Sequence, residues 1–393
     1  MTLVLDNRSR RQGEPGMHAL LVGVSAYPHL PGGGGSPAPD SYGMGQLTSP
    51  ALSLFRFAEW LRGHDSHLPV PLASIRALVS ASAKEVEVEP ALAEFGGEPT
   101  SAELLRVAKD WREDVASHRD NVATFYFAGH GIKETKDNVI LVLKDFGDGV
   151  GGALRNAVDT DSLREGMAPT EARPNIGRRQ LYFVDACRTY PASLRNFAQL
   201  DWTRVFDVEF TELPDDRKDP VFFAAVPGST AYAVDGEPTL FSEALFTCLD
   251  GGAGILAEIE GEERWHVTIS SLSRALGTVL DRLNEDEGAD QEFDTGGSWR
   301  APDAPVVYLE TPPDVDVRIT LEPSEAVANT RLEVLDRRGQ VLATPNPLEP
   351  HPFECRWPAG YYAFNAYPAP PGQPTVDVLR QVFPPSYDKK IAL

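Results

Sequence analysis

The chain has 393 residues, of which 36 are basic and 58 are acidic, so its formal net charge is −22. This charge repels nucleic acid and anionic membrane surfaces, which excludes a binder of phosphate backbones unless a basic patch forms locally. The length is enough for one large domain or two smaller ones with proper cores, and we favour two.

Three widely separated cysteines, Cys187, Cys248 and Cys355, do not make a disulfide framework, which predicts a reducing interior. The amino terminus lacks the apolar core of a signal peptide, and no apolar run approaches the length of a membrane span. The sequence therefore predicts a cytoplasmic protein with no nucleic-acid or membrane partner.

The amino-terminal part of the chain begins with residues 1–16, which have no periodicity and predict a flexible arm. The apolar run 18–25 then predicts the first buried strand. The next segment, 28–45, is rich in Gly, Pro and Ser but lacks the Gly-Lys-Ser/Thr ending of a phosphate-binding loop. It predicts a flexible surface loop, with a loop of the substrate cleft or of activation as the alternative.

A covering helix is predicted over 50–62 and a second strand over 75–79. His64 and His67 predict a solvated turn, with a metal site as the sharper alternative. Alternating Glu and Val over 85–89 predict a solvated strand or linker, for which calcium binding is the alternative.

An apolar stripe predicts a helix over 100–117, which crosses back to a strand over 122–128. That strand ends in Gly129-His130-Gly131 and so delivers an imidazole. A hairpin over 132–144, turning at 136–138, is expected to follow.

The run Leu181–Val184 predicts a strand covered on both faces, and Asp185, Ala186 and Cys187 follow it directly. Ligands of open α/β sheets bind beyond the carboxyl ends of the strands. We therefore expect His130 and Cys187 at the ends of adjacent strands.

The segment 188–220 has few regular signals, and its length favours a processing or gating loop. Beyond residue 310 the helical period disappears, and short alternating strands predict a small antiparallel β-sandwich of Ig-like size over 311–393. Docking or restraint is its expected role. Further elements are predicted at 161–167, 221–225, 240–249, 269–283 and 305–309.

The two strand-end motifs, Gly129-His130-Gly131 and Asp185-Ala186-Cys187, stand about 57 positions apart (187 − 130). In this order and spacing they resemble the caspase and metacaspase clan of cysteine peptidases, in particular the caspase-like proteins of bacteria. The resemblance covers residues 17–310. It implies an α/β fold whose mostly parallel sheet is flanked by helices.

The resemblance also implies a cysteine endopeptidase that needs no cofactor, although it leaves a calcium requirement open. Cys187 would be the nucleophile and His130 the general acid and base. The backbone N–H groups of Gly131 and Cys187 would form the oxyanion hole. The alternative is a catalytically silent caspase-fold scaffold, in which both side chains are structural.

Asp185 matches the position at which metacaspase-like relatives keep an acid at the floor of the S1 pocket. Because a carboxylate pairs well with a guanidinium, cleavage after Arg is expected first and after Lys second. Asp235 is a second candidate acid, and Ser229 lies in a segment, 227–232, that is similar to one lining the substrate cleft. Asp185 could instead cap the next helix.

Relatives of this kind in bacteria often serve defence or cell-death cascades, which implies a zymogen. The expected partners are protein substrates with exposed Arg or Lys and an upstream activating protease or regulator. Candidate sites of self-cleavage are Arg10, Arg11, Arg188, Arg195, Arg204, Arg217 and Lys218.

Overall fold

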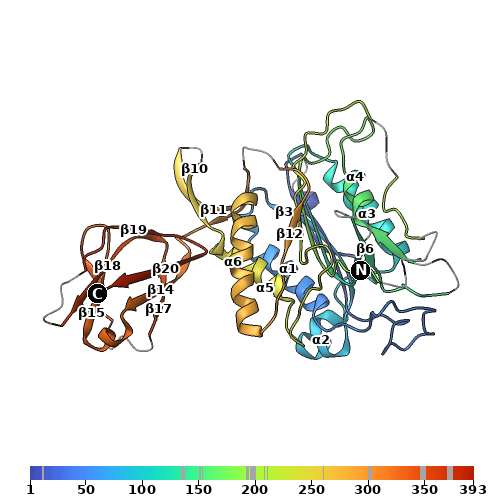
Figure 1. Cartoon of the computed structure of the whole chain (residues 1–393). Coiled ribbons are helices and arrows are strands. Elements are labelled where there is room, and N and C mark those ends of the chain that lie inside the picture. The colour runs from blue at the N-terminus through green and yellow to red at the C-terminus, as the bar shows by residue number, and fades with distance from the viewer. Residues whose placement is uncertain are drawn as a thin grey trace. The chain divides into compact units, whose positions relative to one another are not determined.

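The computed structural model describes residues 1–10, 13–133, 138–149, 152, 154–191, 194, 201–207, 209, 211–259, 261–299, 303–345, 351–369 and 375–393. The chain forms two compact units (Figure 1). The first comprises Met1–Phe246 and Leu280–Asp303, and the second comprises Thr247–Val279 and Ala304–Leu393.

The first unit contains a seven-stranded sheet in the order β1-β3-β2-β4-β8-β9-β12. The five central strands run parallel, and the two edge strands are antiparallel to their neighbours. This sheet confirms the predicted fold class. The strands span Leu3–Asp6 (β1), Met17–Val24 (β2), Leu72–Ser80 (β3), Val122–Gly129 (β4), Arg179–Ala186 (β8), Val221–Phe223 (β9) and Asp294–Gly296 (β12).

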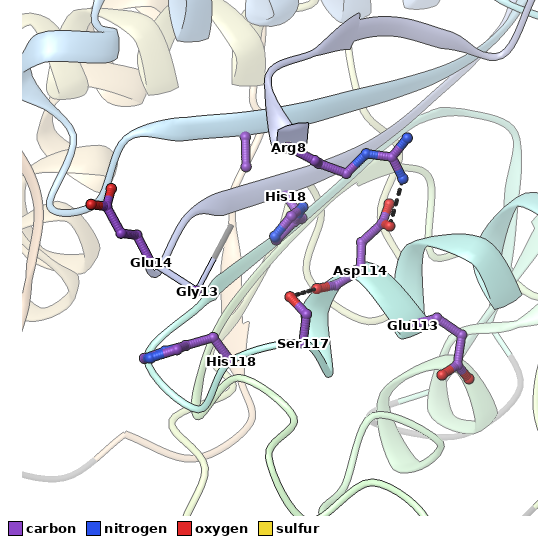
Figure 2. Close-up of a pocket in the computed structure, with 9 residues that line it drawn as sticks. Arg8, Gly13, Glu14, His18, Glu113, Asp114, Ser117 and His118 are labelled. Carbon is purple, nitrogen blue, oxygen red and sulfur yellow. Dashed lines mark hydrogen bonds and ion pairs between the residues drawn. The ribbon is translucent and has the colours of Figure 1, made fainter. Parts of the chain in front are cut away.

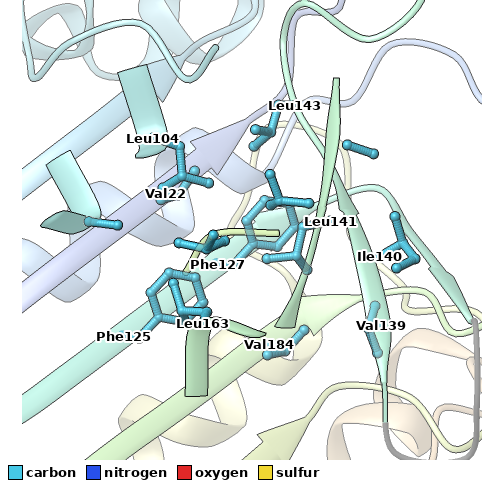
Figure 3. Packing of buried hydrophobic residues seen from close by; sticks show 14 of the residues in the cluster. Val22, Leu104, Phe125, Phe127, Val139, Ile140, Leu141, Leu143, Leu163 and Val184 are labelled. Atoms are coloured by element: carbon cyan, nitrogen blue, oxygen red, sulfur yellow. The ribbon is translucent and has the colours of Figure 1, made fainter. Parts of the chain in front are cut away.

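Helices cover both faces of this sheet, which explains why β2 and β4 are buried along their whole length. On one face, Trp111 of α3 packs in the same core as Phe125 and Phe127 of β4 (Figure 3 shows part of this cluster). On the other face, the ring centres of Phe57 of α1 and Tyr126 of β4 lie 5.1 Å apart. The helices of the described chain are α1 (Pro50–Gly63), α2 (Ala83–Val88), α3 (Ser101–Val115), α4 (Thr160–Glu165), α5 (Leu240–Thr247) and α6 (Ile269–Glu287), and α6 belongs to the second unit as far as Val279.

The predicted hairpin after Gly131 is confirmed. Strands β5 (Gly131–Lys133) and β6 (Val139–Val142) pair antiparallel, and β7 (Ala157–Asp159) joins β6. Of the predicted turn, residues 136 and 137 lie outside the described residues.

Two expectations for the first unit are wrong. The supposedly flexible arm contributes β1, which pairs with β3 at the edge of the sheet, and Arg8 Nη1 donates to Asp114 Oδ1 at 2.7 Å. Most of the supposed strand or linker over 85–89 lies in helix α2, which ends at Val88, and Glu85 is fully buried. Ser82 and Glu85 form a capping box, a helix-start signal that outweighs the Glu-Val alternation.

The second unit is rich in strands. Sheets β17-β14-β20 and β16-β15-β18-β19 share one apolar core, to which Val317 of β14 and Phe364 of β18 both contribute. An antiparallel sandwich was expected, but β14 pairs parallel with β20, so this part of the prediction is wrong. The unit contains β10 (Ile255–Ile259), β11 (Glu262–Thr268), β13 (Pro305–Leu309), β14 (Asp314–Glu322), β15 (Thr330–Leu335), β16 (Val341–Ala343), β17 (Phe353–Pro358), β18 (Gly360–Pro368), β19 (Arg380–Val382) and β20 (Ser386–Ala392).

No helix within the described ranges is both long enough and apolar enough to cross a membrane.

Candidate active site

The carboxyl ends of β4 and β8 bring His130 and Cys187 together. The two strands pair parallel and in register up to Gly129 and Ala186, so each side chain follows the last paired residue of its strand. Adjacent strands lie about 4.8 Å apart. The approach remains close beyond the strand ends, because a Cβ on Gly131 would stand 2.6 Å from the Cys187 carbonyl oxygen. Glycine is therefore required at position 131.

Backbone contacts determine the state of the His130 ring. Its Nε2 lies 2.8 Å from the carbonyl oxygen of Gly45, and burial lowers the pKa of the ring. A carbonyl oxygen can only accept a hydrogen bond, so in the neutral ring Nε2 carries the proton and Nδ1 is left as a base. The His130 backbone N–H donates to Tyr27 Oη at 2.9 Å, and the two rings lie 5.0 Å apart.

The Cys187 thiol is half-buried and accepts a hydrogen bond from the Ala231 backbone N–H, with 3.3 Å between nitrogen and sulfur. Burial raises the pKa of this thiol, the Ala231 contact lowers it, and the charge of Asp185 raises it further. The net direction is upward, so burial favours the protonated thiol and the neutral imidazole. A thiol in this state needs a base to become a nucleophile.

Asp185 is fully buried on the strand that carries Cys187. Its Oδ2 accepts hydrogen bonds from Tyr126 Oη at 3.1 Å, from Ser242 Oγ at 2.9 Å and from Thr239 Oγ1. Burial raises the pKa of the Asp185 carboxyl to about 6, against the lowering effect of these donors. Its Oδ1 is buried and has no hydrogen-bond partner within the described part of the chain. Among the described residues, the carboxylate thus contacts side-chain hydroxyls and caps no following helix.

The segment after β9 contacts both Cys187 and Asp185, through Ala231 and Thr239 respectively. Ser229 contributes its carbonyl, which accepts the Arg188 N–H at 3.0 Å. Asp235 lies between the paired residues Ala233 and Thr239, is exposed, and forms an ion pair with Lys84 of α2. The structure therefore brings Ser229 next to the strand end and leaves Asp235 in a surface ion pair.

Sequence reasoning missed the residues that hold His130, because it treated 28–45 as a flexible surface loop. The Gly45 contact supports the cleft-loop alternative. A Cβ on Gly33 would stand 2.3 Å from the Tyr27 carbonyl oxygen, so this glycine marks close packing against Tyr27. The hydroxyls of Tyr126, Thr239 and Ser242 were also missed, since nothing in the local sequence links them to Asp185.

Two of the proposed sites of self-cleavage have buried side chains. Arg188 has no exposed surface, and its guanidinium pairs with Asp294 Oδ2 at 2.8 Å and lies 4.2 Å from the Phe223 ring centre. The Arg217 side chain is 7% exposed and is paired with Asp215. Arg10 and Arg204 are exposed and Lys218 is half-buried, whereas Arg11 and Arg195 lie outside the described residues.

The structure also contains a separate cavity of about 350 Å³ (Figure 2). His18, near the start of β2, and the end of α3 line it, whereas Cys187 follows the opposite ends of the parallel strands. Its Asp114 carboxylate pairs with Arg8 and Arg76. Across the described ranges, no three His, Cys, Asp or Glu side chains come together as metal ligands.

Three comparisons place the chain among known proteins. A protein of Sinorhizobium fredii named "Uncharacterized protein y4kE" is 25% identical over 213 residues, which covers 52% of this chain and 57% of that relative. The match thus spans little more than half of the relative's length.

Two solved structures are similar at low sequence identity. A protein from Geobacter sulfurreducens is 12% identical, with a TM-score of 0.41 over 73% of this chain and 96% of that one. Caspase-1 from Spodoptera frugiperda is 11% identical, with a TM-score of 0.40 over 74% and 88% of the two chains. The model of the caspase domain matches residues 17–262, more than half of the sequence, so the chain belongs to the caspase domain family and has its cysteine peptidase-like scaffold.

Proposed function

We propose that this protein is a cysteine endopeptidase that cleaves proteins after basic residues, with Cys187 as the nucleophile and His130 as the acid–base group. The observation that carries the proposal is the in-register pairing of β4 and β8. Because Gly129 pairs with Ala186, His130 and Cys187 are the next residues at two neighbouring strand ends. Membership of the caspase domain family supports the same reaction class.

The proposed reaction uses the tautomer that Gly45 favours. His130 Nδ1 takes the thiol proton as sulfur attacks the scissile carbonyl, while the N–H groups of Gly131 and Cys187 stabilise the oxyanion. The ring then gives the proton to the leaving amine, and a thioester remains on Cys187. Water, deprotonated by the same ring, hydrolyses the thioester and restores the thiol.

The proposed preference for basic residues rests on Asp185. A buried carboxylate with an unpartnered oxygen gains from pairing with a cation, because the dielectric around it is low. Arg and Lys supply such a cation at P1, with Arg expected first because its guanidinium matches carboxylates best.

Regulation as a zymogen is part of the proposal. The segment 188–220 follows the candidate nucleophile directly, and its Arg204 is exposed. An upstream protease or a regulatory partner would act there, in a bacterial defence or cell-death cascade. With Arg188 and Arg217 buried, Arg204 is the exposed candidate cut in the described part of this segment, and Lys218 is a half-buried one.

The test is hydrolysis of fluorogenic peptides that differ only at P1 (Arg, Lys, Asp or Leu), with native protein, Cys187→Ala, and samples nicked by trypsin that is then inhibited. We expect release from Arg and Lys peptides that vanishes in Cys187→Ala. Dependence on nicking would support the zymogen. Turnover of the Asp peptide alone would eliminate the role of Asp185.

A matched pair of variants separates the two candidate acids. Asp185→Asn should lower kcat/KM for Arg and Lys peptides by about 30-fold or more, because a buried charge pair is lost. Asp235→Asn should change it less than about threefold, since an exposed ion pair contributes little. If no sample hydrolyses any peptide and an arginine chloromethylketone does not label Cys187, the result would favour the catalytically silent scaffold.

A further inference from the structure

The carboxamide of Gln46 ties together the two ends of the 28–45 loop. Its Oε1 accepts the Tyr27 N–H at 2.9 Å, and its Nε2 donates to the Tyr27 carbonyl at 2.8 Å. The carbonyl oxygens of Pro31 and Leu30 lie 3.2 and 3.4 Å from the same nitrogen. One amide thus binds both backbone groups of a residue 19 positions earlier in the chain.

The two residues that Gln46 links are the ones that hold His130. Gly45, its neighbour in sequence, places its carbonyl oxygen 2.8 Å from His130 Nε2. Tyr27 places its hydroxyl 2.9 Å from the His130 backbone nitrogen and 3.4 Å from the Val142 carbonyl oxygen. His130 is therefore contacted at its ring by Gly45 and at its backbone N–H by Tyr27. Gln46 follows Gly45 in the chain and is hydrogen-bonded to Tyr27.

The glycines of this loop differ in how closely they are packed. The space for a Cβ on Gly33 is filled by Tyr27 and Pro28 carbonyl oxygens at 2.3 and 2.4 Å. Gly32 has φ of +85°, and a Cβ there would stand 3.2 Å from Gln46 Cγ. In contrast, a Cβ on Gly34 would meet nothing within 4 Å, which makes that position a control within the same loop.

We propose that Gln46 is a positioning residue for His130. By tying the loop end to Tyr27, its carboxamide keeps the Gly45 carbonyl against Nε2 and so selects the tautomer in which Nδ1 is unprotonated. Without that carbonyl, the proton of the neutral ring distributes between both nitrogens, and a ring protonated at Nδ1 cannot take a proton from the thiol there. The expected effect of Gln46 on catalysis rests on the proposed function. Its expected effect on which ring nitrogen of His130 is protonated does not.

The first test is long-range ¹H–¹⁵N NMR of histidine-labelled full-length protein, with the His130 signals assigned by their loss in His130→Gln. Native protein and Gly34→Ala should show one neutral tautomer, protonated at Nε2. Gln46→Ala should show signals of both tautomers. Gln46→Glu, which keeps an acceptor for Tyr27 but loses every donor, should behave like Gln46→Ala.

Kinetics of Arg or Lys peptides provide the second readout. Gln46→Ala and Gln46→Glu should lower kcat by about 10- to 100-fold with KM changed less than about threefold, because a small misplacement of a catalytic group costs that much. Gly34→Ala should match the native enzyme. Thermal unfolding identifies a variant that fails to fold. If one Gln46 variant does not fold, the kcat of the other tests the proposal.

A single Nε2–H tautomer and an unchanged kcat in folded Gln46→Ala would overturn the proposal. If native protein hydrolyses no peptide, the endopeptidase fails, and the NMR comparison still decides the role of Gln46. Mixed tautomers in Gln46→Ala would support the positioning role in either case.

Discussion

At Asp185, a fully buried carboxyl group links the stability of the fold to pH. Burial raises its pKa from the usual 3.8 to about 6, so the folded chain holds this proton more tightly than the unfolded chain does. The resulting stabilisation is present below about pH 4 and is lost as pH rises through 6. Two pKa units correspond to about 3 kcal/mol.

Asp185→Asn removes this titration. Relative to the variant, we expect native protein to lose about 3 kcal/mol of unfolding free energy between pH 4 and pH 7.5, measured by urea unfolding at both values. Other titrating groups act in both proteins and cancel in the difference. Equal changes in the two proteins would mean that Asp185 is not buried as a proton-holding group.

At the scale of elements, α1 and α2 are joined by the buried Glu85. Its Oε1 accepts from Ser25 Oγ at 2.8 Å and from the N–H groups of Ala51 and Leu52 at 2.9 and 3.3 Å. Its Oε2 accepts from the N–H and the hydroxyl of Ser82. The first turn of α1 has unpaired N–H groups, so one carboxylate satisfies the starts of two helices and the end of β2.

Glu85→Ala should therefore cost about 3 kcal/mol or more of unfolding free energy, because several buried donors lose their acceptor together. Glu87→Ala changes an exposed glutamate of the same helix and should cost less than about 0.5 kcal/mol. Urea unfolding of both variants checks the difference. Similar values would show that Glu85 is dispensable for the start of α1.

For the whole molecule, the burial of basic residues determines where proteases can cut. Trypsin should cleave the native chain after the exposed Arg10 and Arg204 before it cleaves after Arg188 or Arg217, because a buried side chain must first be freed by local unfolding. Mass spectrometry of a time course gives the order. In urea, all four sites should be cut at comparable rates, and an early native cut after Arg188 would contradict its burial.

Much of the first unit could be predicted from local sequence patterns. The apolar run before Asp185 and the one before His130 indicated buried strands, and their ends indicated the candidate site, because burial on both faces requires a continuous apolar segment. The Glu-Val alternation over 85–89 misled, because the start of α2 depends on the capping box of Ser82 and Glu85, which the strand prediction did not consider. A pattern within a few residues is enough for such elements.

Only the tertiary structure decided how His130 and Asp185 are held. The Tyr27, Gly45 and Gln46 contacts join loop residues without periodicity, and Thr239 reaches Asp185 across 54 positions of the chain. β1 likewise became a strand by pairing with β3 across the sheet edge. The sequence by itself determined the parallel strands and the order of their motifs, since neighbouring residues encode local periodicity. Contacts between distant segments depend on packing, which no local pattern records.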